Sequence, residues 1–265
     1  LMDGKPVLSC ALKADKAVLS AWPGRRVVNG GEERPGVRGI MEHALACARA
    51  LPHRADFAGW IEVPGRGEHR LVLGALRALA LRLGMSPGRK AITPAIERCS
   101  GAFARAFLRG LFDADGTVIG TQEKGVSVRL AQSDLERLSA VQRMLLRLGI
   151  ASVVYRNRRP SGESVLPDGR GERRIYRTAA QHELVVAGEN LRMFADRIGF
   201  ADTAKAARLA RSLGGYRRAL NRERFVARVE ALVPLGERDV FDVAVPGINA
   251  FDANGIVVHN CGEQP

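Results

Sequence analysis

Three consecutive residues near the end of the sequence, His259, Asn260 and Cys261, have side chains that together can cleave a peptide bond. The side-chain amide of Asn260 can attack its own backbone carbonyl to form a succinimide, while His259 protonates the amine that leaves. The thiol of Cys261 can hold an acyl group beforehand as a thioester. We therefore expect these three residues to be catalytic in a peptide-bond rearrangement.

The segment that leads to this tripeptide resembles the C-terminal splicing region of an intein. The resemblance covers roughly residues 222–260 and is carried by the runs VFDVAVPG and GIVVHN. It implies that rearrangement at Asn260 is the intended chemistry, and that Asp242, at the family's aspartate position, is a catalytic residue that tunes the Cys261 thiol. The sequence departs from the family at Asn249, which stands where the family has a histidine.

A second candidate for chemistry is the pair of carboxylates at Asp113 and Asp115. Residues 103–112 place apolar side chains at helical spacing, and the sequence DADG stops the pattern, so both carboxylates should lie at the C-terminal end of a helix. Carboxylates beside phosphates suit Mg²⁺, which prefers hard oxygen ligands and keeps several waters. An EF-hand is excluded, because its sixth loop position must be glycine and is Val118 here.

The sequence LRGLFDADG, residues 108–116, resembles the signature of LAGLIDADG homing endonucleases. The resemblance implies a DNA endonuclease in which Asp115 binds Mg²⁺ and Asp113 is structural. The small Gly110 would let two such helices pack closely, so that an acid from each repeat meets around shared metal. Asp3 precedes Asp115 by about the length of one α+β repeat, and we expect it to be the second metal ligand.

Two further blocks are similar to those of intein endonucleases. The run KAITP, which begins at Lys90, resembles the basic block before the second motif, and RMFADRIGF over residues 192–200, followed by Lys205, resembles the late block. A lysine near the scissile phosphate stabilises developing charge or positions water. We expect Lys90 to be the catalytic lysine, with Lys205 as a second candidate.

The periodicity predicts an α+β fold of tandem αββαββα repeats. The intein resemblance implies that the C-terminal β part of a Hint (intein splicing) domain follows them. In the second repeat, a capping box from Ser133 to Glu136 should open a helix that ends near 148–149. The other elements expected in this repeat are a helix over 103–112, strands over 117–121, 126–131, 151–156 and 174–186, and a helix over 188–197. For the first repeat we expect strands over 7–12 and 58–63 and helices over 36–51 and 69–83, with the opening helix absent. The expected domains are residues 1–95, 96–212 and 213–260, with 261–265 as flanking host sequence.

The charge of the chain favours a polyanionic partner. The sequence holds 41 Lys and Arg against 28 Asp and Glu, a net charge of +13, and the excess lies in residues 1–212. Such an excess is a plausible footprint for double-stranded DNA, although a GC-rich genome would also raise the arginine content. Strands can present side chains to base edges in the major groove. The DNA-binding candidates are Arg129, Gln132, Arg156, Arg158, Arg159, Arg173, Arg174 and Arg177.

The final residues, CGEQP from Cys261 to Pro265, resemble a stretch of cobalamin-dependent (class II) ribonucleotide reductases whose cysteine carries the thiyl radical. The resemblance implies that the element interrupts such a host protein, so that a reductase annotation could be inherited from the host.

The chain begins with Leu1, where inteins have Cys or Ser, and we therefore expect an N-terminally truncated intein. Its partners for splicing would be the missing N-terminal intein segment and the flanking host protein, and no cofactor would be needed. A decayed endonuclease that serves as a DNA-binding or splicing-support module is the alternative.

Composition also argues against membrane, secreted, disulfide-rich and zinc-binding proteins. No apolar run of membrane-spanning length is present, and the first residues lack the order of a signal peptide, so we expect a cytoplasmic protein without a membrane partner. The four cysteines are scattered without a CxxC pair, which indicates neither a disulfide framework nor a zinc site.

Overall fold

A computed structural model describes most of the chain between residues 8 and 259. The described residues are 8–13, 15–23, 35–88, 91–121, 123–167, 173–215, 229, 231–239, 247, 250–253 and 256–259. In these parts, no helix is long and apolar enough to cross a membrane.

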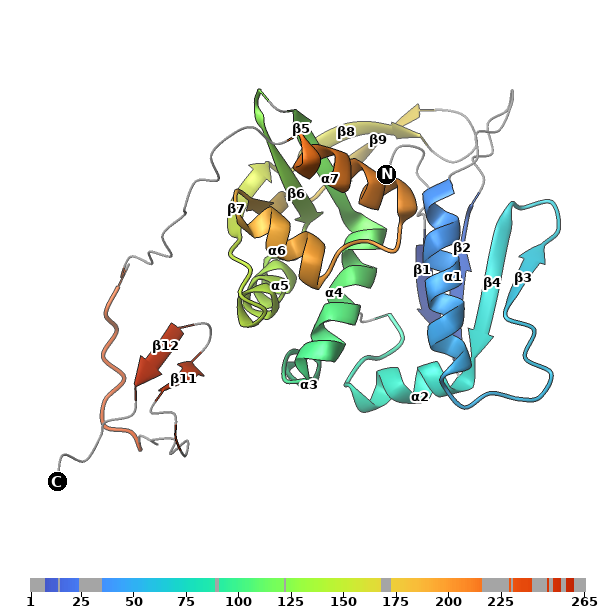
Figure 1. The fold of residues 1–265 in the computed structure, drawn as a ribbon, viewed down its shortest axis with the longest axis horizontal. Helices are drawn as coiled ribbons and strands as arrows, with labels where there is room; N and C mark the ends of the chain where they lie inside the picture. Colours follow the sequence, from blue (N-terminus) through green and yellow to red (C-terminus); the bar gives the residue numbers. More distant parts are fainter. Residues whose placement is uncertain are drawn as a thin grey trace.

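The first half of the chain forms a four-stranded antiparallel sheet with a helix packed on it (Figure 1). Its strand order is β1-β2-β4-β3, and the buried side chains of Leu71 and Leu73 face Leu45 and Ala48 of the long helix. The elements are β1 (Leu8–Leu12), β2 (Ala17–Ala21), α1 (Pro35–Arg49), β3 (Trp60–Val63), β4 (Glu68–Leu73) and α2 (Gly74–Arg82).

The second half repeats this plan, with two helices that precede its sheet in the sequence. Its sheet has the order β5-β6-β10-β7, and a separate two-stranded ribbon is formed by β8 and β9. The elements are α3 (Pro94–Glu97), α4 (Gly101–Asp115), β5 (Gly116–Thr121), β6 (Gly125–Gln132), α5 (Leu135–Arg147), β7 (Val153–Arg159), β8 (Gly162–Pro167), β9 (Arg173–Thr178), β10 (Gln181–Ala187), α6 (Asn190–Arg197) and α7 (Thr203–Gly214). Near the C-terminus, β11 (Ala250–Ala253) and β12 (Ile256–His259) pair as an antiparallel hairpin.

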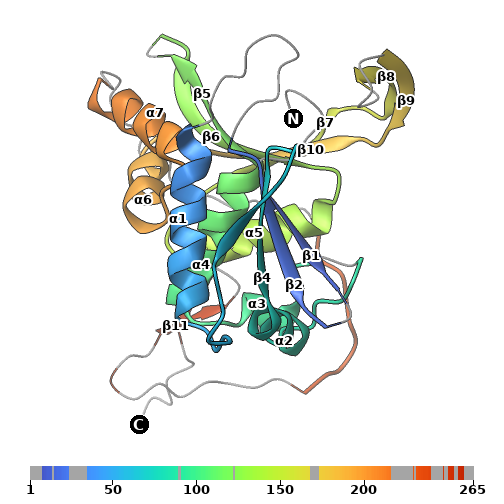
Figure 2. The ribbon, with the colours of Figure 1, turned by 90° about the vertical axis from the view of Figure 1, so that its right-hand side faces the viewer.

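The main core lies between the second sheet and its helices. Alternate residues of the central strands are buried, as expected for a sheet with one covered face. Phe112 of α4 and Phe194 of α6 meet edge to face in this core, with ring centroids 4.9 Å apart. The strand residues that complete the core include Val126, Val128, Leu130, Leu184 and Val186. Burial of this face fixes α4 near the centre of the molecule (Figures 1 and 2).

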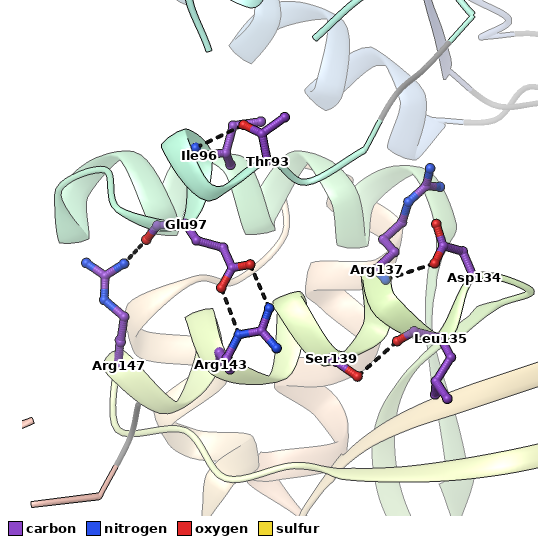
Figure 3. A network of polar contacts seen from close by, with 9 residues as sticks. All are labelled: Thr93, Ile96, Glu97, Asp134, Leu135, Arg137, Ser139, Arg143 and Arg147. Carbon is purple, nitrogen blue, oxygen red and sulfur yellow. Dashed lines mark hydrogen bonds and ion pairs between the residues drawn. The ribbon is translucent and has the colours of Figure 1, made fainter. Parts of the chain in front are cut away.

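Polar contacts anchor the N-terminal end of α4 through the short helix α3 (Figure 3). Arg143 of α5 donates to both carboxylate oxygens of Glu97, at 2.7 and 2.8 Å. Arg147 donates to the backbone carbonyls of Glu97 and Cys99, and the hydroxyl of Ser100 caps α4 by accepting from the Phe103 amide. A bidentate guanidinium–carboxylate pair fixes orientation as well as distance. The start of α4 is therefore held against α5.

The structure confirms the mixed α+β architecture and corrects several expected elements. The helix expected over 69–83 is wrong in its first part, because Glu68–Leu73 form β4 and only Gly74–Arg82 are helical. A short apolar run does not distinguish a strand from a helix, and pairing with β2 and β3 decides it here. The cap of α5 is Asp134 rather than Ser133, since the Asp134 carboxylate accepts from the Arg137 amide at 3.1 Å.

Strand β2 and the pairing of β8 with β9 were also not expected. The sequence did not indicate β2, which pairs with both β1 and β4. The connection expected between strands 151–156 and 174–186 contains β8 and β9, so the expected second strand is divided between β9 and β10. These strands are short and strand propensity depends on context, so the local pattern did not separate them from connecting segments.

Candidate functional site

Asp115 is the last residue of α4 and its side chain is exposed. Gln132, the last residue of β6, donates its side-chain amide to Asp115 Oδ2 at 2.9 Å. Because an ionised carboxylate can only accept, this contact fixes which end of the Gln132 amide faces Asp115. Arg137 donates to the Gln132 oxygen at 3.3 Å and completes the chain of contacts. One oxygen of Asp115 is thus oriented by the protein while the carboxylate stays open to solvent.

Asp113, two residues earlier, has a different environment. Its side chain is buried, with 1% of the residue exposed, and it accepts the backbone amides of Ala201 and Asp202 at 3.2 and 3.0 Å. Burial raises the pKa of the Asp113 carboxyl above its ordinary value, against the opposing effect of these two hydrogen bonds and of the nearby Lys205 charge. These contacts tie the Asp113 side chain to the backbone before α7.

Lys205, near the start of α7, approaches the same end of α4. Its Nζ donates to the carbonyls of Phe112 and Asp113, at 3.2 and 2.5 Å. Burial lowers the pKa of Lys205, while the charges of Asp202, Asp113 and Asp115 act in the opposite direction. A cation at a helix C-terminus is favourable because the last carbonyls have no helical partner. The amine predicted as a late-block lysine therefore caps α4 beside Asp115.

The first repeat packs on this junction. Asp202 caps α7 by accepting the amides of Ala204 and Lys205, both at 3.0 Å. A Cβ at Gly36 of α1 would collide with the Asp202 carboxylate, and a Cβ at Gly39 would collide with the Ala201 carbonyl. Glycine at these two positions lets α1 approach the backbone that holds Asp113.

The residues present fit one half of a magnesium site. No group of three or more His, Cys, Asp or Glu side chains that could hold a metal occurs among the described residues. Magnesium in enzymes is commonly bound by one or two carboxylates together with substrate phosphates and water, so the exposed Asp115 carboxylate suits this role. Asp3, the expected second ligand, lies outside the described residues.

Several other expected catalytic residues also fall outside the described parts of the chain, namely Lys90, Asp242, Asn260 and Cys261. His259 is the last residue of β12 and pairs in register with Ala250 of β11. The hairpin therefore ends at the residue before Asn260.

Two of the predicted DNA-binding arginines meet on one acidic side chain. Arg129 of β6 donates to Ser127 Oγ at 2.8 Å and to Glu183 Oε2 at 3.1 Å. Arg158 of β7 lies 3.6 Å from the same Glu183 oxygen. Only 17% of the Glu183 side chain is exposed, so its carboxylate is held in place by its neighbours. The fixed carboxylate orients both guanidinium groups. Sequence patterning did not identify Glu183.

An irregularity in β7 brings Arg158 to this position. Asn157 adopts a positive φ of 50° and donates its amide to His182 Nδ1 at 3.0 Å, and the register with β10 shifts between Gln181 and Glu183. Such a bulge re-aims the side chains that follow it. The Arg158 guanidinium consequently lies 5.5 Å from the ring centroid of Tyr155.

The remaining predicted arginines lie on exposed strand positions. Arg156 and Arg159 belong to β7, while Arg173, Arg174 and Arg177 belong to β9 of the two-stranded ribbon. The ribbon continues from the ends of β7 and β10 and projects beyond the four-stranded sheet (Figure 2). Gln132 differs from these arginines in that its side-chain amide donates to Asp115.

Comparison with known proteins identifies similar sequences within two larger enzymes. The chain is 34% identical over 165 residues to a DNA polymerase of Thermococcus hydrothermalis, a match that covers 60% of this chain and 9% of the polymerase. It is 30% identical over 162 residues to the ribonucleoside-diphosphate reductase NrdEB subunit alpha of Bacillus subtilis, covering 60% of this chain and 15% of that subunit. The chain thus corresponds to a small part of each relative.

Solved structures of the homing endonuclease I-DmoI are also similar to this chain. A structure of its mesophilic variants is 15% identical and covers 72% of this chain and 87% of that one, with a TM-score of 0.41. A complex of I-DmoI with DNA and manganese is 15% identical, covers 74% and 89% of the two chains, and has a TM-score of 0.35. Residues 102–199, which include most of α4 with Asp115 and the whole second sheet, match the family described as LAGLIDADG-like domain. This part of the chain is therefore similar to the LAGLIDADG-like domain family.

Proposed function

We propose that this chain is a site-specific DNA endonuclease that hydrolyses phosphodiester bonds with the help of Mg²⁺ at Asp115. The observation that carries the proposal is that the Asp115 carboxylate is both exposed and held in one orientation. Asp115 is exposed at the end of a buried helix, and Gln132 orients it within a LAGLIDADG-like domain that also presents arginines on its sheet. A rigidly placed, solvent-open carboxylate suits metal-assisted attack on a phosphate.

Each nearby residue has a distinct part in the proposed reaction. A bound Mg²⁺ would activate water and stabilise the charge that develops on the leaving oxygen. Asp115 holds the metal, and Gln132 keeps its carboxylate in one orientation. Lys205 and Asp113 fix the helix end from which Asp115 extends. Asp3 completes the metal site from the first repeat, and Lys90 stabilises developing charge at the scissile phosphate.

The proposed substrate is double-stranded DNA, the host gene without the inserted element. Arg129 and Arg158, oriented by Glu183, face the duplex from the sheet. Gln132 belongs to the metal site rather than to base reading, because its amide already donates to Asp115. The remaining contacts to phosphates and guanines come from Arg156, Arg159, Arg173, Arg174 and Arg177.

Cleavage of a random duplex library tests the proposal whatever the target sequence is. The full chain, incubated with the library and Mg²⁺, should yield recurrent cut ends, and Asp115→Asn should yield none while it still binds DNA. The matched control is Asp196→Asn, an exposed carboxylate on α6, which should cut at the rate of the parent. Undiminished cutting by Asp115→Asn would refute its role as metal ligand. Binding without cutting by the parent would instead favour the decayed, DNA-binding alternative.

We infer a second activity, cyclisation of Asn260, from the β11–β12 hairpin. His259 is the last paired residue of the hairpin, so Asn260 and Cys261 follow directly in the sequence. Pairing of this kind limits the motion of the backbone that Asn260 must attack. In this proposal the segment is the downstream part of an intein, which works with an upstream splicing segment and with host protein on both sides.

A reporter protein fused after Pro265 tests this second activity in the chain as it stands. Mass spectrometry should detect a released product that begins with Cys261. Asn260→Ala should stop release because alanine has no amide with which to cyclise, and His259→Ala should slow it. Release that persists in Asn260→Ala would overturn the assignment.

A further inference from the structure

The β8–β9 ribbon carries an exposed pair of apolar side chains. Val165 of β8 and Ile175 of β9 face each other across the ribbon, and 58% and 67% of their surfaces are exposed. Single exposed apolar residues are common on proteins. Two β-branched residues directly opposite one another, on a ribbon whose packing is chiefly between its own two strands, form a patch that water contacts on the open face.

Charged residues on the same face bracket this pair. Side chains two residues apart on a strand share a face, so Arg173 and Arg177 lie on either side of Ile175. Across the ribbon, Glu163 pairs with Arg177 and is the only described acidic residue of β8 and β9. The face is therefore an apolar centre between two arginines, which matches a polyanion that offers apolar groups between its charges.

Duplex DNA has this combination in its major groove. A two-stranded ribbon fits the groove, phosphates border it, and the C5-methyl of thymine is the apolar group on its base edges. Arginine flanks would contact the phosphates while the apolar centre reaches the bases.

We propose that Val165 and Ile175 contact thymine methyl groups in the major groove and thereby make the ribbon select thymine at these positions. The inference rests on the proposed binding of DNA and adds a determinant of specificity to it. The ribbon projects beyond β7 and β10, so this face is not covered by the four-stranded sheet (Figure 2).

Removal of single methyl groups from the DNA tests the inference. Repeated rounds of binding selection from a random duplex pool, with the full chain, first define a bound sequence. Each thymine of that duplex is then replaced by deoxyuridine, which lacks only the methyl group. At the contacted positions the parent should bind about fourfold more weakly per methyl removed, from the free energy of burying one such group.

A double variant locates the contact. Val165→Thr with Ile175→Thr keeps both side chains β-branched and strand-compatible, while a hydroxyl replaces one methyl group of Val165 and the ethyl group of Ile175. This variant should discriminate less than the parent between the thymine and deoxyuridine duplexes at those positions, because each threonine keeps only one methyl group. The control Leu81→Ala, an exposed apolar residue on α2, should keep the full sensitivity of the parent.

The outcomes separate the two proposals. If no sequence emerges from the selection, DNA recognition fails and the inference fails with it. If a sequence emerges but the parent binds every deoxyuridine duplex as tightly as the thymine duplex, the inference alone is overturned, and no variant is needed for that result. A methyl sensitivity that persists unchanged in the double variant also overturns it, since other residues then read the methyls.

Discussion

Lys205 of α7 donates its ammonium group to the backbone carbonyl of Asp113 in α4, at 2.5 Å, while the Asp113 carboxylate accepts two amides from the loop before α7. The end of α4 thus accepts a side-chain hydrogen bond from α7 and backbone hydrogen bonds from the loop before it. Each contact satisfies backbone groups that a helix end leaves without a partner. The junction fixes the position of Asp115, two residues beyond Asp113, although neither Lys205 nor Asp113 need touch a substrate.

Asp113→Asn should destabilise the fold by about 1–3 kcal/mol, the cost of a buried donor without an acceptor. Asparagine has one acceptor oxygen, so it cannot accept both the Ala201 and the Asp202 amides as the carboxylate does. Urea unfolding measures the difference. Asp196→Asn on the surface of α6 is the control and should change stability by less than about 0.5 kcal/mol. An equal effect of the two substitutions would show that the Asp113 junction does not stabilise the fold.

The contribution of Asp113 should also depend on pH in a defined direction. Burial raises its pKa above the ordinary value of 3.8, so the folded state binds this proton more tightly than the unfolded state. Its contribution is therefore fully present below pH 3.8 and is lost as the pH rises through the raised pKa. The free energy of unfolding of the parent, minus that of Asp113→Asn, should shrink across this range. A difference that grows with pH would mean that the hydrogen bonds outweigh burial and that the pKa is lowered.

Gln132→Ala should reduce the rate of DNA cleavage about 10- to 100-fold while binding changes little, because it removes the group that orients the Asp115 carboxylate. Single-turnover cleavage and a binding titration measure the two effects separately. Gln142→Ala is the matched control, since Gln142 donates to the Ser152 carbonyl on the far side of α5. If Gln132→Ala weakens binding and leaves the cleavage rate intact, Gln132 acts as a base-reading residue, as its strand position first suggested.

Glu183→Gln should raise non-specific DNA affinity and steepen its dependence on salt by about one unit of slope, because one negative charge between Arg129 and Arg158 is removed. Discrimination between the selected duplex and random DNA should fall, since both guanidinium groups lose their fixed partner. Titrations at several salt concentrations measure both quantities. Glu42→Gln, an exposed position on α1, serves as control, and an identical response of the two variants would remove Glu183 from the interface.

Gly39→Ala should destabilise the protein by about 1–3 kcal/mol, because the added Cβ would collide with the Ala201 carbonyl and push α1 away from the α6–α7 loop. Gly110→Ala is the matched substitution, also within a helix, where an added Cβ meets no described atom within 4 Å. Within the described structure alanine should raise stability there by about 0.5–1 kcal/mol. Thermal unfolding of both variants measures the contrast. A destabilising Gly110→Ala would indicate that a further segment packs against this face of α4, as the expected pairing of motif helices requires.

Local pattern was sufficient for the part of the site that depends on neighbouring residues. The apolar spacing before Asp113 and Asp115 predicted a helix that ends at these carboxylates, and α4 ends at Asp115. The strands around the turn at residues 123–125 and the helix after Asp134 were also found within a few residues. In each of these elements the periodicity and the cap or turn lie within one short stretch, so the sequence contains the whole signal.

Contacts between residues far apart in the sequence could not be predicted from local pattern. Nothing local to His69 and Leu73 distinguishes the β4 strand from a helix, and its pairing with β2 and β3 makes the choice. Nothing local to Glu183 shows that it meets Arg129 across the sheet.

The sequence by itself determined which side chains could perform chemistry, because residue types and close spacing are properties of the chain. Tertiary structure alone decided their roles. It buried Asp113 and left Asp115 exposed, although they are two residues apart on one helix, since only Asp113 faces the amides of the α6–α7 loop. It also placed Gln132 where it donates to Asp115, and Lys205 where it donates to the last turn of α4. These assignments depend on sheet register and helix packing, which bring together residues that no local pattern connects.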